Sequence, residues 1–499
     1  MAAHEPGQAA PTRPGAAEVS LDPEDWAALR TLGHRMVDDL LGWLETVRDR
    51  PVWRPIPPEV KARFREPLPR EAQGAEQAYR DFQSLVLPHP MGNVHPRFWG
   101  WVIGTGSPLG ALAEMLAAGM NPNCGGADHI AGYVEAQVLD WCKAMLGYPA
   151  DASGILVSGG SVANLLGLAV ARNRGAGWDV RRRGLGGGEA ALTVYASVEA
   201  HSSVQKAVEL LGLGSDALRL APVNEAFEVD VPALAALIEA DRAAGARPCC
   251  LVGNAGTVRT GAMDDLEALA DLAAHHGLWF HVDGAFGALA ALVPEYQPRL
   301  RALARADSLA FDLHKWMCLP IEVGVVLVRD RDAHRQAFAL NPDYLARGDR
   351  GLASGPYWMD DFGIQLSRSF RALKVWLCFK AHGLARYAEV IAQNVAQARY
   401  LASLVDAAPD LERLAPVPLN IVVFRFTQPG ATDGRLNALN AELLIRLQES
   451  GAAVATNATV GGRYGLRVAN VNHRSRREDF DRLVSEVRRL GTALLTEGW

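Results

Sequence analysis

Among the residues that could take part in chemistry, Lys315 has the most unusual sequence surroundings. It stands between His314 and Trp316 in the apolar segment AFDLHKWMCLP. A lysine is rarely buried unless its charge is compensated, so it either runs its stem along an apolar surface or is held inside for its reactivity. The segment alone favours a surface lysine. Whether Lys315 is instead held inside for its reactivity depends on the residues found elsewhere in the chain.

A glycine-rich turn offers a place for a phosphate. The segment GILVSGGSVANLLGLAVARN predicts a strand, then a turn with Gly160 and Ser161, then a helix. Glycines let the backbone approach a ligand closely, and the free N–H groups at a helix N-terminus attract a phosphate. The turn is not a Walker A loop, which needs a lysine and a longer glycine spacing. A simple helix cap is the alternative interpretation.

Two further candidates follow predicted strands. Asp283 ends the strand in LWFHVDGAFGAL, and the small residues Gly284 and Ala285 after it leave room for a flat ring. His201 follows the strand in VYASVEAHSSV and begins a helix. Taken singly, the aspartate could cap a helix and the histidine could be structural.

Together these features are the parts of a pyridoxal-phosphate site. A lysine can bind this cofactor as a Schiff base, and a carboxylate can keep the pyridine nitrogen protonated so that the ring accepts electrons. The phosphate-binding turn, His201, Asp283 and Lys315 occur in that order along the chain. A lysine stored as an imine is not buried as a charge, so we predict that Lys315 is the cofactor anchor.

Alternating helices and short apolar strands must position these residues. Between Ser107 and Asp330, the runs GILVSGG, LTVYAS, PCCLVGNAG, LWFHVDGA and GVVLV are bounded by glycine and separated by helical stretches. This alternation predicts an α/β fold with a mainly parallel sheet, in which ligands gather at the carboxyl ends of the strands. The predicted units are a flexible tail at 1–18, a helical and extended arm at 19–106, a large cofactor-binding domain at 107–385 and a small α+β domain at 386–499.

The composition argues against several classes of protein. The chain has 50 Lys and Arg against 56 Asp and Glu, a formal charge of −6, which does not suit a nucleic-acid-binding protein. No cysteine or histidine pair has the spacing of a metal site. Cys249 and Cys250 are predicted to be buried thiols in a strand. The N-terminus lacks a signal-peptide pattern and no apolar segment could span a bilayer, so we expect a cytoplasmic protein.

Several motifs together resemble the group II pyridoxal-phosphate-dependent amino-acid decarboxylases, which include the aromatic-L-amino-acid and glutamate decarboxylases. The most specific is DLHKW, whose Lys315 lies 32 residues (315 − 283) after the aspartate of HVDGA. SGGSVAN, AHSSVQKA, GTVRTGAMDDL and LSRSFRALKVW also match. The resemblance runs from HPRFWGW to the C-terminus, about four-fifths of the chain. It implies a fold-type I enzyme that acts as a homodimer, with arms that wrap the partner.

The resemblance also implies a role for each matching residue. Lys315 would carry pyridoxal 5'-phosphate, and Asp283 would pair with its pyridine nitrogen. The other cofactor contacts would be Gly160, Ser161, His201, Thr257, Ala285 and His314. His201 would stack on the ring, and Tyr344 in NPDYLA would deliver the proton to the carbanion. Trp101 and Arg467 would contact the substrate.

Departures from the family pattern leave the substrate open. Asp312 stands where relatives often have asparagine near the phosphate, a charge that must be paired or turned away. The segment FWGWV favours an aromatic L-amino acid, decarboxylated to the amine and CO₂, although its rings could equally be packing residues. The alternatives are an acidic amino-acid decarboxylase, a decarboxylation-dependent aldehyde synthase and, from another class, a cofactor-binding regulator without turnover.

Overall fold

A seven-stranded sheet forms the centre of the large unit in this computed structural model, which describes residues 19–188, 190–340 and 347–499. The strand order is β1-β7-β6-β5-β4-β2-β3. Neighbours from β6 through β5, β4 and β2 to β3 are parallel, and β7 runs antiparallel to both β6 and β1. The strands are β1 (Ser153–Val157), β2 (Leu192–Ser197), β3 (Leu218–Ala221), β4 (Arg247–Asn254), β5 (Trp279–Asp283), β6 (Ser308–Asp312) and β7 (Gly324–Val328). The predicted α/β class and mainly parallel sheet are confirmed.

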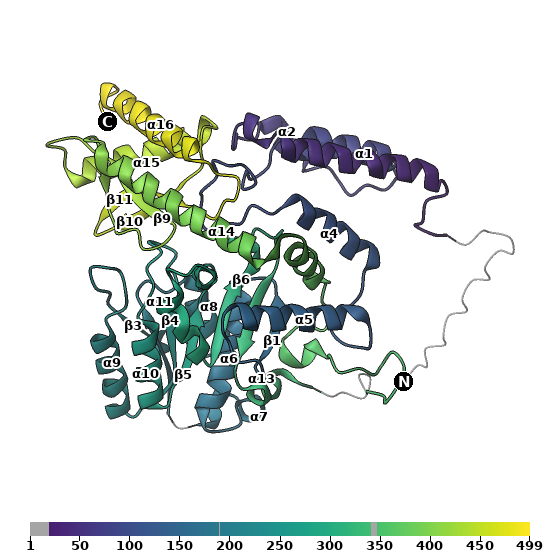
Figure 1. Ribbon diagram of the computed structural model, residues 1–499, viewed down its shortest axis with the longest axis vertical. Coiled ribbons are helices and arrows are strands. Elements are labelled where there is room, and N and C mark those ends of the chain that lie inside the picture. The colour runs from purple at the N-terminus through teal and green to yellow at the C-terminus, as the bar shows by residue number, and fades with distance from the viewer. Residues whose placement is uncertain (1–18, 189, 341–346) are drawn as a thin grey trace, which may run out of the picture.

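Helices surround this sheet and carry the connections between its strands (Figure 1). Helix α6 packs against β4, β5, β6 and β7, and ten of its residues are buried, because it lies across the middle of the sheet. The helices are α1 (Trp26–Glu45), α2 (Pro58–Arg63), α3 (Ala75–Asp81), α4 (Pro108–Met120), α5 (Ile130–Met145), α6 (Gly160–Ala176), α7 (Val180–Arg183), α8 (Ser202–Leu210), α9 (Val231–Ala243), α10 (Leu266–His276), α11 (Gln297–Leu300), α12 (Leu313–Trp316), α13 (Arg331–Phe338), α14 (Arg371–Ala407), α15 (Asp433–Glu449) and α16 (Arg477–Thr496).

Four strands of the large sheet are buried on both faces. Every residue of β2, β5, β6 and β7 is buried, as expected for a sheet covered by helices on both sides. Cys249 and Cys250 lie buried in β4, which confirms that prediction, and all six cysteines are free thiols. The cytoplasmic location stays a prediction.

A smaller unit near the C-terminus has its own sheet and core. Its antiparallel strands have the order β10-β11-β9-β8. They are β8 (Leu411–Arg413), β9 (Ile421–Phe426), β10 (Thr456–Val460) and β11 (Arg463–Ala469), and α15 and α16 pack on them. Helix α14 joins this unit to the large one, with a non-helical residue at Gly383 (φ 70°, ψ 154°). The predicted boundary at 385/386 lies two residues beyond that break and stays a prediction.

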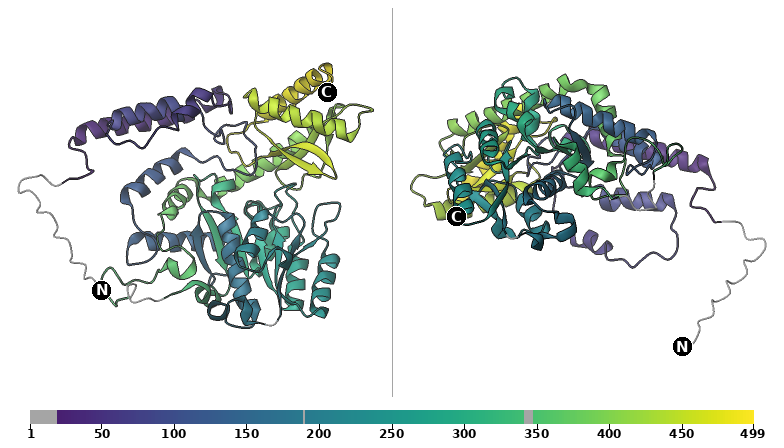
Figure 2. Two further views of the ribbon diagram at one scale, coloured as in Figure 1. Left: turned by 180° about the vertical axis from the view of Figure 1, so that it is seen from behind. Right: turned by 90° about the horizontal axis from the view of Figure 1, so that it is seen from below.

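The N-terminal arm extends away from both units (Figures 1 and 2). Its proline-rich part was expected to be extended, but Pro58 begins the six-residue helix α2, because proline suits the first turn of a helix. The arm joins the small unit through main-chain hydrogen bonds, including Val52 N–H to the Gly451 carbonyl at 2.9 Å. The predicted tail at 1–18 lies outside the described residues. Among those that are described, no helix is long and apolar enough to cross a membrane.

Candidate active site

A cavity of about 330 Å³ opens where β1, β5 and β6 end, at the edge of the sheet where ligands are expected. Fourteen residues from four parts of the chain line it. They are Ser158, Gly159, Gly160, Ser161, Val162, Asn164, His201, Ser203, Asp283, Ala285, Asp312, His314, Lys315 and Glu322. Seven of the residues predicted from the sequence are therefore brought together: Gly160, Ser161, His201, Asp283, Ala285, His314 and Lys315.

Lys315 projects into this cavity with its charge paired. It lies in α12, directly after β6, and its Nζ is 2.8 Å from Asp312 Oδ2. The Lys315 side chain is 21% exposed and that of Asp312 is 1% exposed, so the lysine lies inside the cavity and not on an open surface. The other carboxylate oxygen, Asp312 Oδ1, is buried without a hydrogen-bond partner among the described residues. The negative charge of Asp312, which was predicted to be either paired or turned away, is thus paired with Lys315.

The turn before α6 has the shape of an anion cradle. A Cβ added to Gly160 would lie 2.9 Å from Asp312 Oδ2 and 3.5 Å from Ala285 Cβ, so a side chain there would fill the space. The N-terminus of α6, a helix of 17 residues, opens into the same cavity beside Ser161. Free N–H groups and the helix dipole favour a phosphate here. The residues present therefore fit a phosphorylated cofactor.

Asp283 is a buried acceptor at the end of β5. It is 5% exposed, and its Oδ1 accepts the Ala285 N–H at 3.1 Å. Its Oδ2 accepts from Asn164 Nδ2 at 2.8 Å. Both contacts are donated to the carboxylate, which acts as an acceptor here and could also accept from a protonated pyridine nitrogen.

His201 is the N-cap of α8 and faces the same cavity. Its Nδ1 accepts the Ser203 N–H at 3.2 Å and lies 2.8 Å from Ser203 Oγ. Burial lowers the pKa of His201, while the charge of Asp283 raises it and that of Lys315 lowers it further. The imidazole is therefore neutral at neutral pH.

The ring of His314 is held by a main-chain contact. Its Nδ1 lies 3.0 Å from the Val323 carbonyl, and burial lowers the pKa of this histidine. Glu322, in the loop after α12, also lines the cavity and pairs with Arg371 Nη2 at 2.8 Å. These contacts fix the rim of the cavity around the lysine.

Among the lining residues that were not predicted from the sequence as site residues are Asn164, Ser203 and Glu322. Asn164 is the one polar residue among the buried residues of α6, a pattern that could have marked it. Ser203 follows His201 by two residues and Glu322 lies in a loop, and neither has a comparable pattern in the sequence.

Four predicted residues lie elsewhere or are not described. Thr257 is buried, and its hydroxyl lies 3.2 Å from that of Thr260. Trp101 is 51% exposed, and its carbonyl accepts from Arg467 Nη1 at 3.3 Å. Thr257, Trp101 and Arg467 do not line the cavity around Lys315. Tyr344 lies outside the described residues.

Arg467 has an unusual environment of its own. It is 4% exposed, and Nε and Nη2 have no partner among the described residues. Burial lowers the pKa of this guanidinium to about 10. Its assignment to the substrate stays a prediction.

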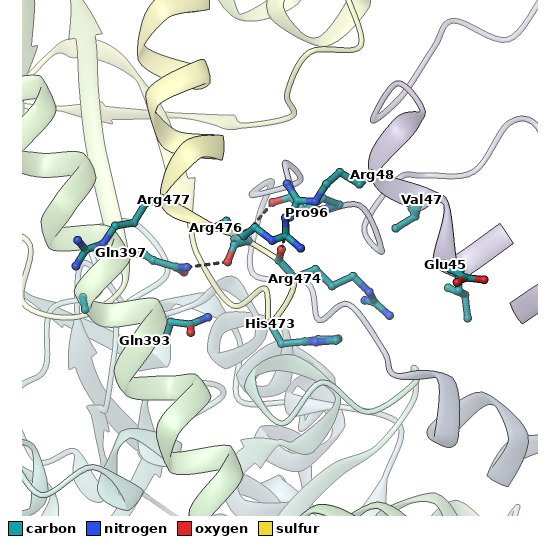
Figure 3. Close-up of a pocket in the computed structure, with 13 residues that line it drawn as sticks. Glu45, Val47, Arg48, Pro96, Gln393, Gln397, His473, Arg474, Arg476 and Arg477 are labelled. Carbon is teal, nitrogen blue, oxygen red and sulfur yellow. Dashed lines mark hydrogen bonds between the residues drawn. The ribbon is translucent and has the colours of Figure 1, made fainter. Parts of the chain in front are cut away.

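A larger cavity of about 740 Å³ lies between the end of α1, α14 and the segment before α16 (Figure 3). Arginines line it, but acids already neutralise two of them. Arg48 pairs with Asp479 at 2.8 Å, and Arg476 pairs with Glu478 at 3.4 Å. Its described lining contains neither a lysine nor a glycine-rich turn, so the smaller cavity is the better candidate for chemistry.

Comparison with known proteins agrees with this geometry. Residues 57–427 match the family model of the pyridoxal-dependent decarboxylase conserved domain. The aromatic-L-amino-acid decarboxylase of Bacillus atrophaeus is 31% identical over 467 residues, which cover 93% of this chain and 95% of the relative. The chain therefore belongs to the pyridoxal-dependent decarboxylase family, and it is a pyridoxal-phosphate-dependent carboxy-lyase acting on an amino acid.

Other relatives differ in the reaction or substrate that their names give. Phenylacetaldehyde synthase of Petunia hybrida is 29% identical over 466 residues, or 90% of each chain. The crystal structure of Oryza sativa TDC with PLP and tryptamine superposes with a TM-score of 0.87 at 26% identity, covering 95% of this chain and all of that one. The family thus defines the cofactor and the decarboxylation of an amino acid, and it leaves the identity of the amino acid and of the product open.

Proposed function

We propose that the protein decarboxylates an aromatic L-amino acid and releases the amine. The observation that carries the reaction is the pairing of Lys315 with Asp312 in one cavity with Asp283, His201 and the turn before α6. The aromatic preference is supported by the names of the relatives, which include tryptophan decarboxylase 2 of Oryza sativa and tyrosine decarboxylase 1 of Narcissus pseudonarcissus. The rings of FWGWV do not support it, because Trp99 packs on Phe480 in the core of the small unit and Trp101 does not line the cavity.

Each residue of the cavity would have a separate role in the reaction. Pyridoxal phosphate, when bound, draws electrons away from the substrate Cα so that the carboxylate can leave as CO₂. Lys315 would hold the cofactor covalently, and the turn at Gly160 and Ser161 would hold its phosphate. Asp283, oriented by its two N–H donors, would keep the pyridine nitrogen protonated. The neutral ring of His201 would lie against the cofactor without adding a charge.

An acidic substrate within the same family is the first alternative. The glutamate decarboxylase domain of a Vibrio parahaemolyticus protein superposes with a TM-score of 0.84 at 25% identity over 95% of this chain. The test is CO₂ release from each standard amino acid by the holoenzyme. We expect the highest kcat/KM for tryptophan, tyrosine or phenylalanine. A higher kcat/KM for glutamate or aspartate would contradict the aromatic proposal.

Aldehyde synthesis is the second alternative, favoured by the match to phenylacetaldehyde synthase. After CO₂ leaves, the carbanion either takes a proton at Cα or gives electrons to oxygen, and a positioned acid decides which is faster. The resemblance to the family implies that Tyr344, which lies outside the described residues, is this acid. Tyr344→Phe keeps the ring and removes the transferable proton, so it should release CO₂ more slowly and shift product from amine to aldehyde.

The measurement is the amine-to-aldehyde ratio under air for wild type and Tyr344→Phe. Mainly aldehyde from the wild type would contradict the decarboxylase proposal. Amine from Tyr344→Phe at the wild-type rate would move the proton donor elsewhere, with His201 the next candidate.

We also propose that two copies of the chain form a dimer through the arm. Only Leu32 of α1 is buried, while Trp26, Leu29, Met36 and Leu40 are between 36% and 59% exposed. The residues at 29, 36 and 40 share one helical face, which a second α1 would cover. Light scattering should give twice the chain mass of 53.7 kDa for wild type and for Ile445→Glu, a control on the exposed face of α15. The Leu29→Glu/Met36→Glu variant should be monomeric, and a stable dimer would contradict the proposal.

A further inference from the structure

A continuous series of hydrogen bonds runs from the middle of the large sheet to the candidate site. It passes through Trp279, Ser308, His281, Asn164, Ser203 and His201. His281 and Ser308 are completely buried, and Asn164 is 1% exposed. Buried polar groups of this kind are costly unless each has a partner, so the direction of each hydrogen bond can be worked out from the others.

The direction is fixed at one end by Asp283. Its ionised carboxylate can only accept, so the Asn164 atom 2.8 Å from Asp283 Oδ2 is the amide nitrogen. The carbonyl of the same amide then faces His281 Nε2 at 2.9 Å and must accept a proton from it. Neutral His281 with a proton on Nε2 has a free lone pair on Nδ1. This nitrogen accepts the Ser308 hydroxyl at 2.7 Å.

The contacts at the other end are consistent with this direction. Trp279 Nε1 can only donate, and it lies 2.7 Å from Ser308 Oγ. Ser308 therefore accepts from Trp279 and donates to His281. Because a donor-only group and an acceptor-only group stand at the two ends, every hydrogen bond between them has one consistent polarity.

A branch of this series determines which ring nitrogen of His201 carries the proton. The second N–H of the Asn164 amide points at Ser203 Oγ at 2.9 Å. Ser203 then donates its own hydroxyl proton to His201 Nδ1 at 2.8 Å, and the Ser203 backbone N–H points at the same nitrogen at 3.2 Å. Nδ1 thus carries no proton, and neutral His201 presents its N–H at Nε2.

We propose that Asn164 and His281 are positioning residues that orient both Asp283 and His201 for the cofactor. Asn164 directs one N–H to each branch, and His281 holds the Asn164 amide so that it cannot rotate. The inference rests on the proposed function of Asp283 and His201, and it adds the protonation state in which each is held. Neither Asn164 nor His281 has to touch the substrate.

A glycine on α6 makes room for this arrangement. A Cβ at Gly167 would lie 2.7 Å from His281 Cε1 and 2.8 Å from His281 Nδ1. Gly167 is three residues after Asn164, so the two lie on the same face of the helix. One turn of α6 therefore supplies both the amide that contacts His281 and the space for its ring.

The first experiment reads the protonation states directly. Holoenzyme labelled with ¹⁵N-histidine is examined by solid-state NMR at neutral pH, with His201→Gln and His281→Gln used for assignment. We expect protonated Nε2 and unprotonated Nδ1 for both His201 and His281. A proton on Nδ1 of either ring, or a doubly protonated ring, would overturn the inference. Because no substrate is involved, the result is independent of which amino acid the enzyme uses.

The second experiment breaks the series at its far end. Ser308→Ala removes the partner of His281 Nδ1 and leaves Asn164, Asp283 and His201 unchanged. The matched control is Ser153→Ala. Ser153 is also a buried serine of the large sheet, and its hydroxyl lies 2.9 Å from Nδ1 of another buried histidine, His334, which does not line the candidate site.

Cofactor affinity and the His201 spectrum are compared for the two variants. Ser308→Ala should weaken the binding of pyridoxal phosphate about tenfold, the scale of one buried hydrogen bond, and should shift the His201 ¹⁵N signals. Ser153→Ala should leave cofactor affinity within about twofold, although both variants lose similar stability. Equal effects of the two substitutions on cofactor affinity and on His201 would show that Ser308 is only structural and would overturn the inference.

Discussion

At the scale of single residues, the buried carboxylate of Asp312 sets the electrostatics around Lys315. One of its oxygens pairs with the lysine and the other has no partner among the described residues. A bound phosphate would bring further negative charge to the neighbouring turn at Gly160. The free lysine is therefore stabilised by Asp312, while the bound phosphate is not.

Asp312→Asn should consequently bind pyridoxal phosphate more tightly. Removing one buried negative charge beside the phosphate should lower Kd by about three- to tenfold, equivalent to about 1 kcal/mol. The control is Glu442→Gln in α15, which removes an acid that pairs with Arg446 and does not line the cavity, and it should change Kd little. Kd is measured by fluorescence titration of the apoprotein. Weaker binding by Asp312→Asn would show that the carboxylate helps to hold the cofactor.

The residues proposed to contact the cofactor ring could be predicted from the sequence. Lys315, Asp283 and His201 follow strands or begin helices, and such positions are readable because glycine and apolar runs mark the ends of elements. Asn164 and His281 could not be paired in this way, since 117 residues separate them and only the packing of α6 on β5 brings them together. Trp101 and Arg467 were assigned by resemblance alone, which carries no geometry for this chain.

At the scale of elements, the alternation of helices and strands in the sequence did not predict the antiparallel orientation of β7. Strands joined by long helical connections are parallel, as β2, β4, β5 and β6 are. Only 11 residues, 313–323, lie between the end of β6 and the start of β7, too few for a parallel crossover, so β7 returns antiparallel. This short return carries Lys315, which is why the lysine stays close to the carboxyl ends of the parallel strands.

A buried ion pair joins three segments of the large unit. Arg368 Nη1 donates to Glu135 Oε2 at 3.0 Å and to the Cys124 carbonyl at 2.7 Å, and Glu135 Oε1 accepts the Leu156 N–H at 3.1 Å. Both side chains are 1% exposed. The pair thus connects α5, the loop at Cys124 and the strand β1 that leads to the phosphate-binding turn.

Removing one member of this pair should destabilise the protein strongly. Arg368→Met leaves the Glu135 charge buried and unpaired, which should cost about 3–5 kcal/mol of unfolding free energy. The double variant Arg368→Met/Glu135→Leu should recover much of that loss, because no unpaired charge is left. Urea unfolding of the holoenzyme measures both. A double variant less stable than Arg368→Met would contradict this account of the pair.

At the scale of the whole molecule, buried histidines make stability depend on pH. Burial lowers the pKa of His281, His95 and His473 to about 4 each, and that of His334 to about 3. Above pH of about 6.5 these histidines are neutral in both the folded and the unfolded chain. As the pH falls from about 6.5 towards 4, only the unfolded chain takes up protons, so the free energy of unfolding decreases.

Each such histidine should contribute up to about 3 kcal/mol to this loss. His334 is the suitable probe, because it is completely buried and does not line the candidate site. His334→Leu should show a shallower fall of the urea midpoint between pH 6.5 and 4 than wild type. His275→Leu, at the exposed C-terminal end of α10, is the control and should keep the wild-type slope. A wild-type slope in His334→Leu would contradict the assignment.

The central claim is that Lys315 carries the cofactor in the cavity formed by α6, α8, β5 and β6. The most direct measurement is reduction of the holoenzyme with borohydride, followed by peptide mapping by mass spectrometry. The account predicts a yellow protein in which pyridoxyl phosphate is fixed to the peptide containing Lys315, and no such product in Lys315→Ala. Pyridoxyl phosphate on any other lysine of the wild-type protein would contradict it.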